Sequence, residues 1–214
     1  MTDTQYHAWL WEKLGHQALE NLKKHGFAGH FVNNADEARD LILELVKDYE
    51  SFGFGGSATA RAIDLPNALG AMGKTVYDHW EPAAEESDLS LRLKQGRCDC
   101  FICSANAISA TGEIVNVDGV GNRTNAMTFG CPKVIIVAGM NKVAVDLDGA
   151  LRRIREVAAP MRAKSLNMST PCAETGICTD CNSPQRICRI TAILHRKPMM
   201  TDVTVVLVNQ SLGF

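Results

Sequence analysis

The sequence predicts an α/β fold: a doubly wound, mostly parallel sheet with an N-terminal helical subregion and a C-terminal cysteine loop. Short apolar or β-branched runs alternate with amphipathic runs of helical length, which predicts the parallel sheet. The clearest apolar run, V-I-I-V-A at 134–138, is continuous, as in a strand that is covered on both faces. The cysteine loop is indicated by a turn-rich, polar segment at 170–188 that cannot bury much surface.

Residues 1–50 are expected to form the helical subregion. Apolar side chains recur at helical spacing across 4–25, and Gly26 ends that run. An apolar run at 27–32 predicts a short strand. Asn34 is a suitable N-cap for a second helix, which carries an apolar stripe and acidic residues in its first turn.

The next segment, 51–160, is expected to be the α/β domain proper, and 161–214 the cysteine-loop segment with a closing strand. Strands separated by helices imply parallel pairing, and the three parts together are expected to form one compact domain. The predicted strands lie at 51–54, 74–78, 98–103, 113–117, 134–138 and 203–208, and the predicted helices at 58–63, 66–73, 84–95 and 146–157.

Composition narrows the class of protein. The chain has 214 residues, 46% hydrophobic and 21% charged, which is ordinary for a globular domain. Its net charge of −2 gives no reason to expect nucleic acid or an anionic membrane as a partner. No apolar run approaches the roughly 20 residues of a membrane span, and no secretion signal is recognisable. We therefore expect a cytoplasmic protein, in which thiols stay reduced.

Four of the eight cysteines, Cys172, Cys178, Cys181 and Cys188, lie within one short segment with the spacing C-x5-C-x2-C-x6-C. One short C-x2-C pair with irregular outer spacing favours an iron–sulfur cluster of the [4Fe–4S] type, whose ligands reach in from a wrapped loop. A structural zinc ion is the alternative, although zinc sites usually pair two short C-x2-4-C units. Unligated or redox-active thiols are the third interpretation.

The remaining cysteines are interpreted as small core residues. Strand alternation in R-C-D-C-F-I-C places Cys98 and Cys100 on one face and Cys103 on the other, which is poor geometry for a shared metal. Cys131 is a single thiol ahead of a proline.

A glycine turn between a predicted strand and helix, F-G-F-G-G-S-A-T, is the first candidate ligand site. Glycines allow close approach of a ligand to the backbone, and the hydroxyls with the free N–H groups of the helix start suit a phosphate or carboxylate. The pattern is neither a Walker loop nor G-x-G-x-x-G, so it does not indicate a nucleotide. A tight turn with Ser57 as N-cap is the structural alternative. The candidate residues are Gly55, Gly56, Ser57 and Thr59.

A second polar stretch, 104–123, is expected at the carboxyl ends of strands, where open α/β sheets bind ligands. Arg123 is a candidate bidentate clamp for an anion, and Glu113 and Asp118 are candidate acid–base groups. Lys142, after the buried strand, is a candidate to neutralise an anionic ligand, with a surface lysine as the alternative. Further candidate contacts are Asn106, Thr111, Asn116, Gly121 and Asn122.

Three blocks in this order resemble the lactate-utilisation (LUD) domain family over roughly residues 35–160: G-F-G-G-S-A-T, the 104–123 stretch ending in G-N-R, and K-V-I-I-V-A-G-M-N-K. The resemblance implies a fold like that of ribose-5-phosphate isomerase, glucosamine-phosphate deaminase and the CoA transferases. It also implies substrate contacts at the glycine turn and at the G-N-R block. The cysteine spacing departs from the ferredoxin-like C-x2-C-x2-C-x3-C-P runs of larger lactate-utilisation subunits, so the chain resembles a short, stand-alone variant.

Members of that family are linked to oxidation of L-lactate through iron–sulfur electron carriers. The resemblance therefore implies a redox-linked, electron-transfer subunit that binds a small anionic metabolite and works with an electron-transfer protein. One alternative is an isomerase- or transferase-like enzyme for a sugar phosphate or CoA ester, with Glu113 or Asp118 catalytic and a zinc staple. Another is a redox-sensing or binding module without turnover. Trp9 and Trp11 flank an apolar face that suits a homo-oligomer contact.

Overall fold

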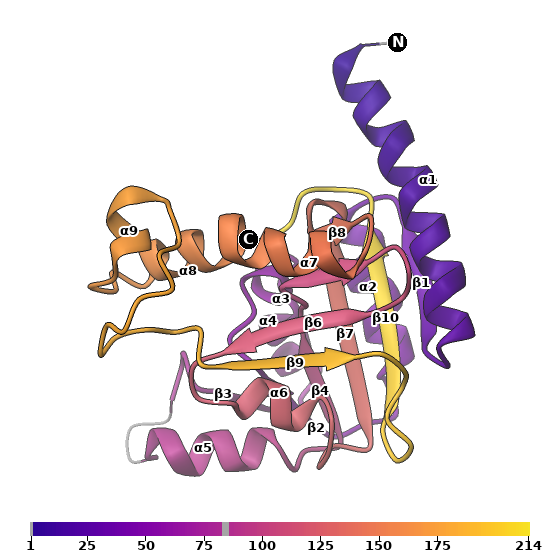
Figure 1. Ribbon diagram of the computed structural model, residues 1–214. Helices are drawn as coiled ribbons and strands as arrows, with labels where there is room; N and C mark the ends of the chain where they lie inside the picture. The colour runs from indigo at the N-terminus through magenta and orange to yellow at the C-terminus, as the bar shows by residue number, and fades with distance from the viewer. Residues whose placement is uncertain (1, 83–85) are drawn as a thin grey trace.

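Six parallel strands form the main sheet in the computed structural model, which describes residues 2–82 and 86–214 (Figure 1). The strand order is β1-β10-β7-β4-β2-β3, so the last strand of the chain lies between the first strand and the buried β7. The predicted parallel α/β sheet is confirmed. Its strands are β1 (Ala28–Val32), β2 (Ser51–Phe54), β3 (Thr75–Asp78), β4 (Cys100–Cys103), β7 (Lys133–Gly139) and β10 (Asp202–Val208).

Helices cover both faces of this sheet, as the continuous apolar character of its strands requires. The long α1 (Asp3–Lys24) packs Leu19 and Leu22 into one core layer, and α2 (Ala35–Leu45) packs Ile42 into the other. Asn34 caps α2 as expected, because its side chain accepts a hydrogen bond from the N–H of Glu37 at 2.9 Å. The further helices here are α3 (Ala58–Ala62), α4 (Leu65–Ala71), α5 (Asp88–Gln95) and α6 (Asn122–Ala126).

A smaller, four-stranded sheet lies over the main sheet, in the order β8-β5-β6-β9. The pairings of β6 with β5 and with β9 are antiparallel. The sequence predicts one of these strands, β6 (Ile114–Asp118). The others were not recognised: β5 (Ala107–Ser109) and β8 (Val143–Ala144) are too short to show alternation, and β9 (Ile190–Leu194) follows the cysteine segment directly.

The predicted helix at 146–157 is part of a longer helical stretch. It begins as α7 (Leu147–Arg153), widens into a π-helical turn, η2 (Ile154–Ala158), and continues as α8 (Ala159–Ser165). Pro160 lacks an N–H group and cannot donate to the regular ladder, which accounts for the irregularity. A short α9 (Pro171–Thr175) then opens the cysteine segment, at the left of Figure 1.

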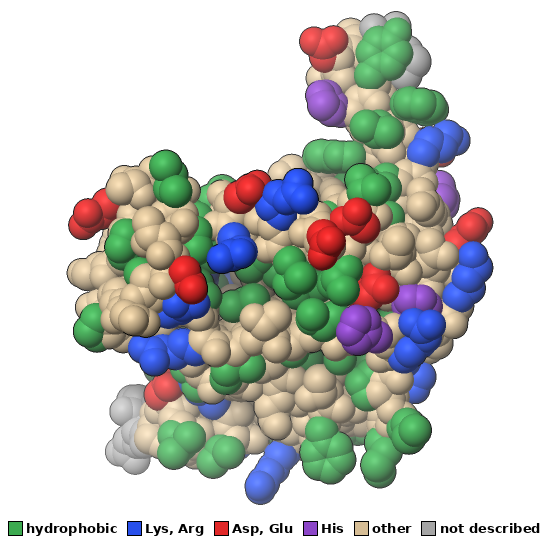
Figure 2. All heavy atoms as spheres, in the orientation of Figure 1, with side chains coloured by type: hydrophobic (Ala, Val, Ile, Leu, Met, Phe, Trp, Pro, Cys, Tyr) green, Lys and Arg blue, Asp and Glu red, His purple; other side chains and the backbone are tan. Residues whose placement is uncertain are grey.

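The first fifty residues contribute to the same body as the rest, because β1 pairs with β10 in the main sheet. The N-terminal part of α1 projects from this body and exposes apolar side chains (Figure 2), among them Tyr6, Trp9 and Leu10. Trp11, by contrast, packs partly against the core. The predicted homo-oligomer contact at this helix stays a prediction.

Two local expectations differ from the structure. The predicted strand at 98–103 begins at Cys100, and Cys98, which precedes it, shares a core layer with Cys103 and not with Cys100. The predicted helix at 84–95 begins at Asp88, and the part at 84–85 lies outside the described residues. No helix among the described residues is long and apolar enough to cross a membrane.

Candidate functional site

Loops at the carboxyl ends of four parallel strands line one cavity of about 460 Å³, together with the turn after β6 and with α8. Neighbouring strands in a parallel sheet end at the same edge, so segments far apart in sequence meet there. The loop after β2 brings Gly55–Ser57, and the one after β3 brings His79. The loop after β4 brings Ser104–Asn106, and η1 (Met140–Lys142), after β7, brings Lys142. We call this space the metabolite cavity; its volume is typical of small-ligand sites.

The glycine turn after β2 is shaped by close contacts on both sides. A Cβ at Gly55 would lie 2.9 Å from the Phe101 ring and 3.2 Å from Cγ of Arg123. Gly56 has φ +70°, and a Cβ there would lie 3.2 Å from the His79 ring. Both positions therefore require glycine. Ser57 acts as the N-cap of α3, because its hydroxyl accepts from the N–H of Ala60 at 3.1 Å.

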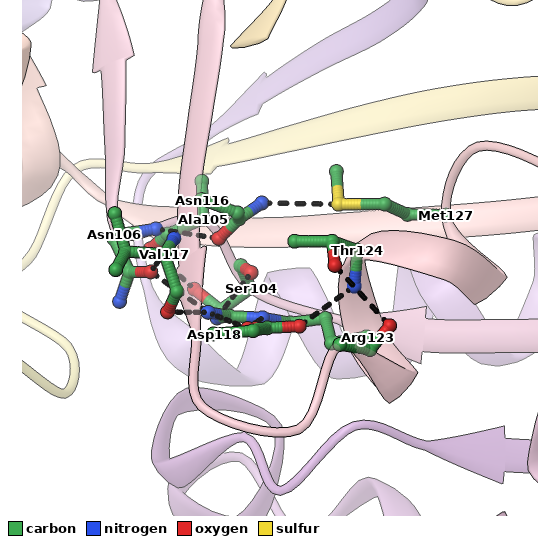
Figure 3. Close-up of polar contacts among 10 residues, drawn as sticks. Ser104, Ala105, Asn106, Asn116, Val117, Asp118, Arg123, Thr124 and Met127 are labelled. Atoms are coloured by element: carbon green, nitrogen blue, oxygen red, sulfur yellow. Dashed lines mark hydrogen bonds and ion pairs between the residues drawn. The ribbon is translucent and has the colours of Figure 1, made fainter. Parts of the chain in front are cut away.

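Arg123 is held by a dense polar network (Figure 3). Its Nε and Nη2 donate to Oδ1 of Asp118 at 2.9 and 2.7 Å. Nη2 also donates to Oδ1 of Asn106 and to the Val117 carbonyl, and Nη1 donates to the Ser104 carbonyl at 3.4 Å. A guanidinium has five N–H groups, so these contacts leave one N–H of Nη1 for a ligand. A bidentate clamp on an anion would require part of this network to open.

Asp118 is fully engaged by the protein. One carboxylate oxygen accepts from Arg123 and the other accepts from the N–H of Thr124 at 2.8 Å. Its side chain is only 8% exposed, although it lines the metabolite cavity. This geometry makes Asp118 the group that orients Arg123 and fixes the start of α6, where Gly121 adopts φ +93°.

Lys142 is buried, not at the surface. It is 4% exposed, and its Nζ lies 2.8 Å from Oγ1 of Thr59 and 2.9 Å from Oγ of Ser104. Thr59, which is fully buried, thus reaches the metabolite cavity only through Lys142. Burial lowers the pKa of Lys142 to about 7, and the nearby Arg153 and Arg123 add to this effect.

Asn122 lines the metabolite cavity and has a buried side-chain donor, Nδ2, without a hydrogen-bond partner among the described residues. A buried amide without a partner is costly, and a bound ligand oxygen would remove that cost. Asn106 is different: its side-chain oxygen already accepts from Arg123 and from the N–H of Val117 at 2.8 Å, so it serves mainly to hold the loop.

His79, which follows β3 and was not among the residues predicted from the sequence, packs against the glycine turn. Nε2 of Gln95 donates to the Tyr77 carbonyl at 3.2 Å and lies 2.9 Å from Nδ1 of His79. The carbonyl fixes the direction of the amide, so Nδ1 accepts and the ring proton sits on Nε2, toward Gly56. Burial and the Arg92 charge lower the pKa of His79, which favours this neutral form.

Cations dominate the lining of the metabolite cavity. The Trp80 ring contacts both Arg61 and Arg162, whose guanidinium carbons lie 4.4 and 4.8 Å from the ring centroid. Arg162 lines the cavity, where burial lowers its pKa. Among the described residues, the lining side chains include Arg92, Arg123, Arg162 and Lys142 against one carboxylate, that of Asp118. Such a surplus of positive groups favours an anionic ligand.

The dipeptide after β3, His79-Trp80, could have been found from the sequence by the same rule that identified the other loops, since it follows the end of a predicted strand.

Glu113 lies elsewhere, in the turn between β5 and β6, and is not among the residues that line the metabolite cavity. Its carboxylate accepts from the Thr111 hydroxyl at 2.6 Å. Burial would raise its pKa, but hydrogen bonds from Thr111 and Ser109 outweigh this and lower it. Thr111 belongs to the same turn, whereas Asn116 is a buried residue of β6 whose side-chain oxygen accepts from the N–H of Asn106.

The four clustered cysteines line a second cavity, of about 310 Å³, which we call the cysteine cavity. Its remaining wall combines apolar side chains, such as Val117, Leu151 and Ile154, with polar and charged ones, among them Arg155 and Asp180. All four thiols are half-buried. Burial raises the pKa of Cys188, and the other three cysteines add to this rise. The four thiols are therefore close enough to interact electrostatically. The structure brings together Cys172, Cys178, Cys181 and Cys188.

Arg186, also missed from the sequence, ties the cysteine segment together. Its Nε donates to the Cys188 carbonyl and its Nη1 to the Cys181 carbonyl, both at 2.7 Å. Its Nη2 lies 2.7 Å from Oδ1 of Asp180. Arg186 lines the cysteine cavity, where a cation favours thiolates. The other four cysteines, by contrast, are buried in the core, as expected: Cys98, Cys100, Cys103 and Cys131.

The metabolite cavity and the cysteine cavity share a wall. Val117 lines both, and the consecutive residues Ile187 and Cys188 line one each. The contact is close, because a Cβ at Gly119 would lie 3.2 Å from the Ile187 carbonyl oxygen. The N–H of Arg189 donates to the Asp118 carbonyl at 2.9 Å. The turn that holds Arg123 therefore packs directly on the cysteine segment.

The comparisons agree with this architecture. A crystal structure described as a DUF162 family protein from Deinococcus radiodurans has a TM-score of 0.57 at 15% sequence identity, and the match covers 92% of this chain and 98% of that one. This likeness shows a shared α/β fold. The sequence profile of the LUD domain matches residues 15–208, so the chain belongs to the LUD-domain family. Among curated proteins, none matches the sequence significantly.

Proposed function

We propose that this LUD-domain protein is a redox-linked subunit in the oxidation of lactate or a similar small hydroxy acid. In this proposal the metabolite cavity binds the anionic metabolite, and the four clustered cysteines hold an iron–sulfur cluster, with [4Fe–4S] favoured. The observation that carries the proposal is the shared wall: Val117 borders both cavities, and Cys188 directly follows a residue that borders the metabolite cavity.

The residues present fit a cluster. Four thiols line one cavity, apolar side chains form part of its wall, and Arg186 supplies a positive charge. The volume of about 310 Å³ is on the order of twenty times what one water molecule needs. Such a cluster, when bound, supplies one-electron transfer.

The zinc alternative requires four sulfurs at about 2.3 Å from one ion, and therefore within about 4 Å of one another. Among residues 2–82 and 86–214, no three Cys, His, Asp or Glu side chains form a group that could hold a metal ion. The preference for a cluster therefore rests on the cysteine spacing, in which one short C-x2-C pair with irregular outer spacing is more typical of a wrapped cluster loop than of two short zinc units.

The role of the metabolite cavity follows from its charges. Arg162 and the one remaining N–H of Arg123 are available to a carboxylate. A turn of the Asn122 side chain toward the cavity would give its buried, unpaired Nδ2 a ligand oxygen as partner. Asp118 keeps Arg123 in place, and His79 presents Nε2–H beside the glycine turn. Lys142 and the Ser104 hydroxyl, which are hydrogen-bonded to each other, also line the metabolite cavity. These groups suit a small carboxylate with a second oxygen on the neighbouring carbon.

Purification without oxygen, followed by iron, sulfide and zinc analysis, tests the cluster. We expect a brown protein with iron and acid-labile sulfide and with broad visible absorbance. A colourless protein with one zinc ion per chain would reject the cluster. Calorimetric titration with lactate and pyruvate tests the metabolite cavity, and we expect binding that is weakened when Arg162 is replaced by Gln.

A further inference from the structure

Lys142 differs from the other cations of the metabolite cavity because it is buried without a carboxylate partner among the described residues. A buried ammonium group normally has a paired charge. Here the two contacts are hydroxyl groups, those of Thr59 and Ser104, at 2.8 and 2.9 Å from Nζ. Gly213 covers the nitrogen from another side, since a Cβ there would lie 3.2 Å from Nζ. One bonding position on Nζ is left for a ligand in the cavity.

The charges around Lys142 disfavour its protonated form. Burial lowers its pKa to about 7, and the positive charges of Arg153 and Arg123 act in the same direction; the Cys103 thiol acts in the opposite one. Arg153 is fixed nearby by its bond to the Asn141 carbonyl at 2.8 Å. A desolvated lysine beside other cations is the arrangement that makes an amine nucleophilic near neutral pH.

We propose that Lys142 is a nucleophile that forms an imine with the carbonyl carbon of a short 2-oxo acid bound in the metabolite cavity. The Nζ–C bond forms, the carbonyl C–O bond breaks, and the oxygen leaves as water, so no oxidant or reductant is required. Ser104, which contacts Nζ and lines the cavity, is placed to pass protons to the departing oxygen, and Thr59 holds Nζ from the buried side.

The substrate class follows from two neighbouring features. A neutral amine reacts with an electrophilic carbonyl, and the cationic lining holds a carboxylate. A 2-oxo acid carries both groups on adjacent carbons, and it is the oxidised partner of a 2-hydroxy acid. The inference rests on the anionic-metabolite site proposed above, and it is independent of the cysteine cavity.

Reductive trapping tests this proposal. The full-length protein is incubated with pyruvate or 2-oxobutyrate and borohydride, and the intact mass and peptide map are measured. We expect one reduced adduct per chain, located on Lys142. The rate of adduct formation is expected to rise with pH through about 7, because the pKa of Lys142 lies there. An ordinary surface lysine would continue to gain reactivity up to about pH 10.4.

Matched variants make the outcome specific. Lys142→Arg keeps a positive charge but cannot form the imine, so no adduct is expected, and thermal unfolding checks that it folds. Lys142→Met serves the same purpose if the larger arginine is not tolerated. Lys164→Arg removes an exposed lysine on α8 and should leave trapping unchanged.

The proposal is overturned if no oxo acid gives an adduct, if the adduct lies on other lysines, or if only a phosphorylated aldehyde is trapped. Its failure is distinguishable from failure of the proposed redox role. Trapping is repeated with a Cys178→Ser, Cys181→Ser double variant, and we expect the same adduct there. An adduct in protein that binds no iron would leave Lys142 as proposed and remove the cluster.

Discussion

The metabolite cavity and the cysteine cavity are neighbours, but they are held in shape differently. Strand ends and buried side chains shape the first: Phe101, Thr59 and Lys142 behind it are nearly inaccessible to solvent. The second is lined from a segment, 169–190, in which only Thr170 and Ala173 are buried. Its internal bonds include those of Arg186 to the Cys181 and Cys188 carbonyls and to Asp180, and those of Ser183 and Gln185 to Ser169.

This difference indicates that the two cavities depend on a ligand to different degrees. The metabolite cavity is preformed, because the sheet would have the same register without any ligand. The cysteine segment has too little buried surface to offset the conformational entropy lost on ordering. We therefore expect a bound inorganic centre to stabilise it, as metal centres do in small domains.

The largest expected effect is loss of the centre itself. The Cys178→Ser, Cys181→Ser double variant should lose its iron, and amide hydrogen exchange should speed up across 170–190 while β2 and β7 remain protected. Cys100→Ala is the matched control: it removes a core cysteine and should lower stability but keep the iron. Equal exchange protection in the double variant and the wild type would show that the cysteine segment holds its shape unaided.

The next largest effect is expected from breaking the buried ion pair between Asp118 and Arg123 in the metabolite cavity. Asp118→Asn keeps the shape but leaves Arg123 without its charge partner, and the cost should be about 2–3 kcal/mol of unfolding free energy. Binding of the anionic metabolite should weaken as well, because Arg123 is no longer oriented. Asp146→Asn changes a helix N-cap into an equally good one and should cost less than about 0.5 kcal/mol. Chemical denaturation and calorimetry measure both quantities.

A pair of glycines compares the two regions directly. Gly56 and Gly176 both have positive φ, at +70° and +76°, but a Cβ at Gly56 meets His79 and one at Gly176 meets nothing within 4 Å. Gly176→Ala should cost about 1 kcal/mol from backbone strain alone. Gly56→Ala should cost about 2 kcal/mol, and it should also abolish metabolite binding. Similar losses of binding in the two variants would contradict a preformed cavity at the glycine turn.

The smallest expected effect comes from replacing two helix N-cap residues, and it distinguishes a capping role of Ser57 from a contact with the ligand. Ser57→Ala and Asn34→Ala each remove an N-cap and should each cost about 1 kcal/mol. Only Ser57 lines the metabolite cavity, so only its replacement should also weaken binding. Equal binding by the two variants would mean that Ser57 serves solely as a cap.

Much of the fold was predictable because its strands are long enough to show their pattern. The run at 134–138 became the centre of the sheet, and the final strand took its place beside it. The smaller sheet was not predictable, since β5 and β8 have three and two residues and are fixed by tertiary pairing. Cys98 was placed on the wrong face because the strand begins two residues later than expected.

The candidate site likewise has features that could be predicted from the sequence and features that could not. Strand-end loops pointed to Ser57, Asn122 and Lys142, all of which line the metabolite cavity. The sequence could not show that Arg123 is saturated by its neighbours or that Lys142 is buried, since both depend on contacts between distant segments. Glu113 looked like Asp118 in the sequence, but it lies in a turn outside the cavity. The shared wall was equally inaccessible to sequence reasoning.

The most direct measurement of the central claim is a spectroscopic titration of the iron-loaded, reduced protein with pyruvate or lactate. Because the two cavities share Val117 and the Ile187–Cys188 link, a bound metabolite should alter the electron paramagnetic resonance signal of the cluster, in proportion to calorimetric occupancy. The Arg162→Gln variant should shift that titration to higher concentration. A metabolite that binds fully and leaves the signal unchanged, or a protein that takes up no iron, would contradict the account.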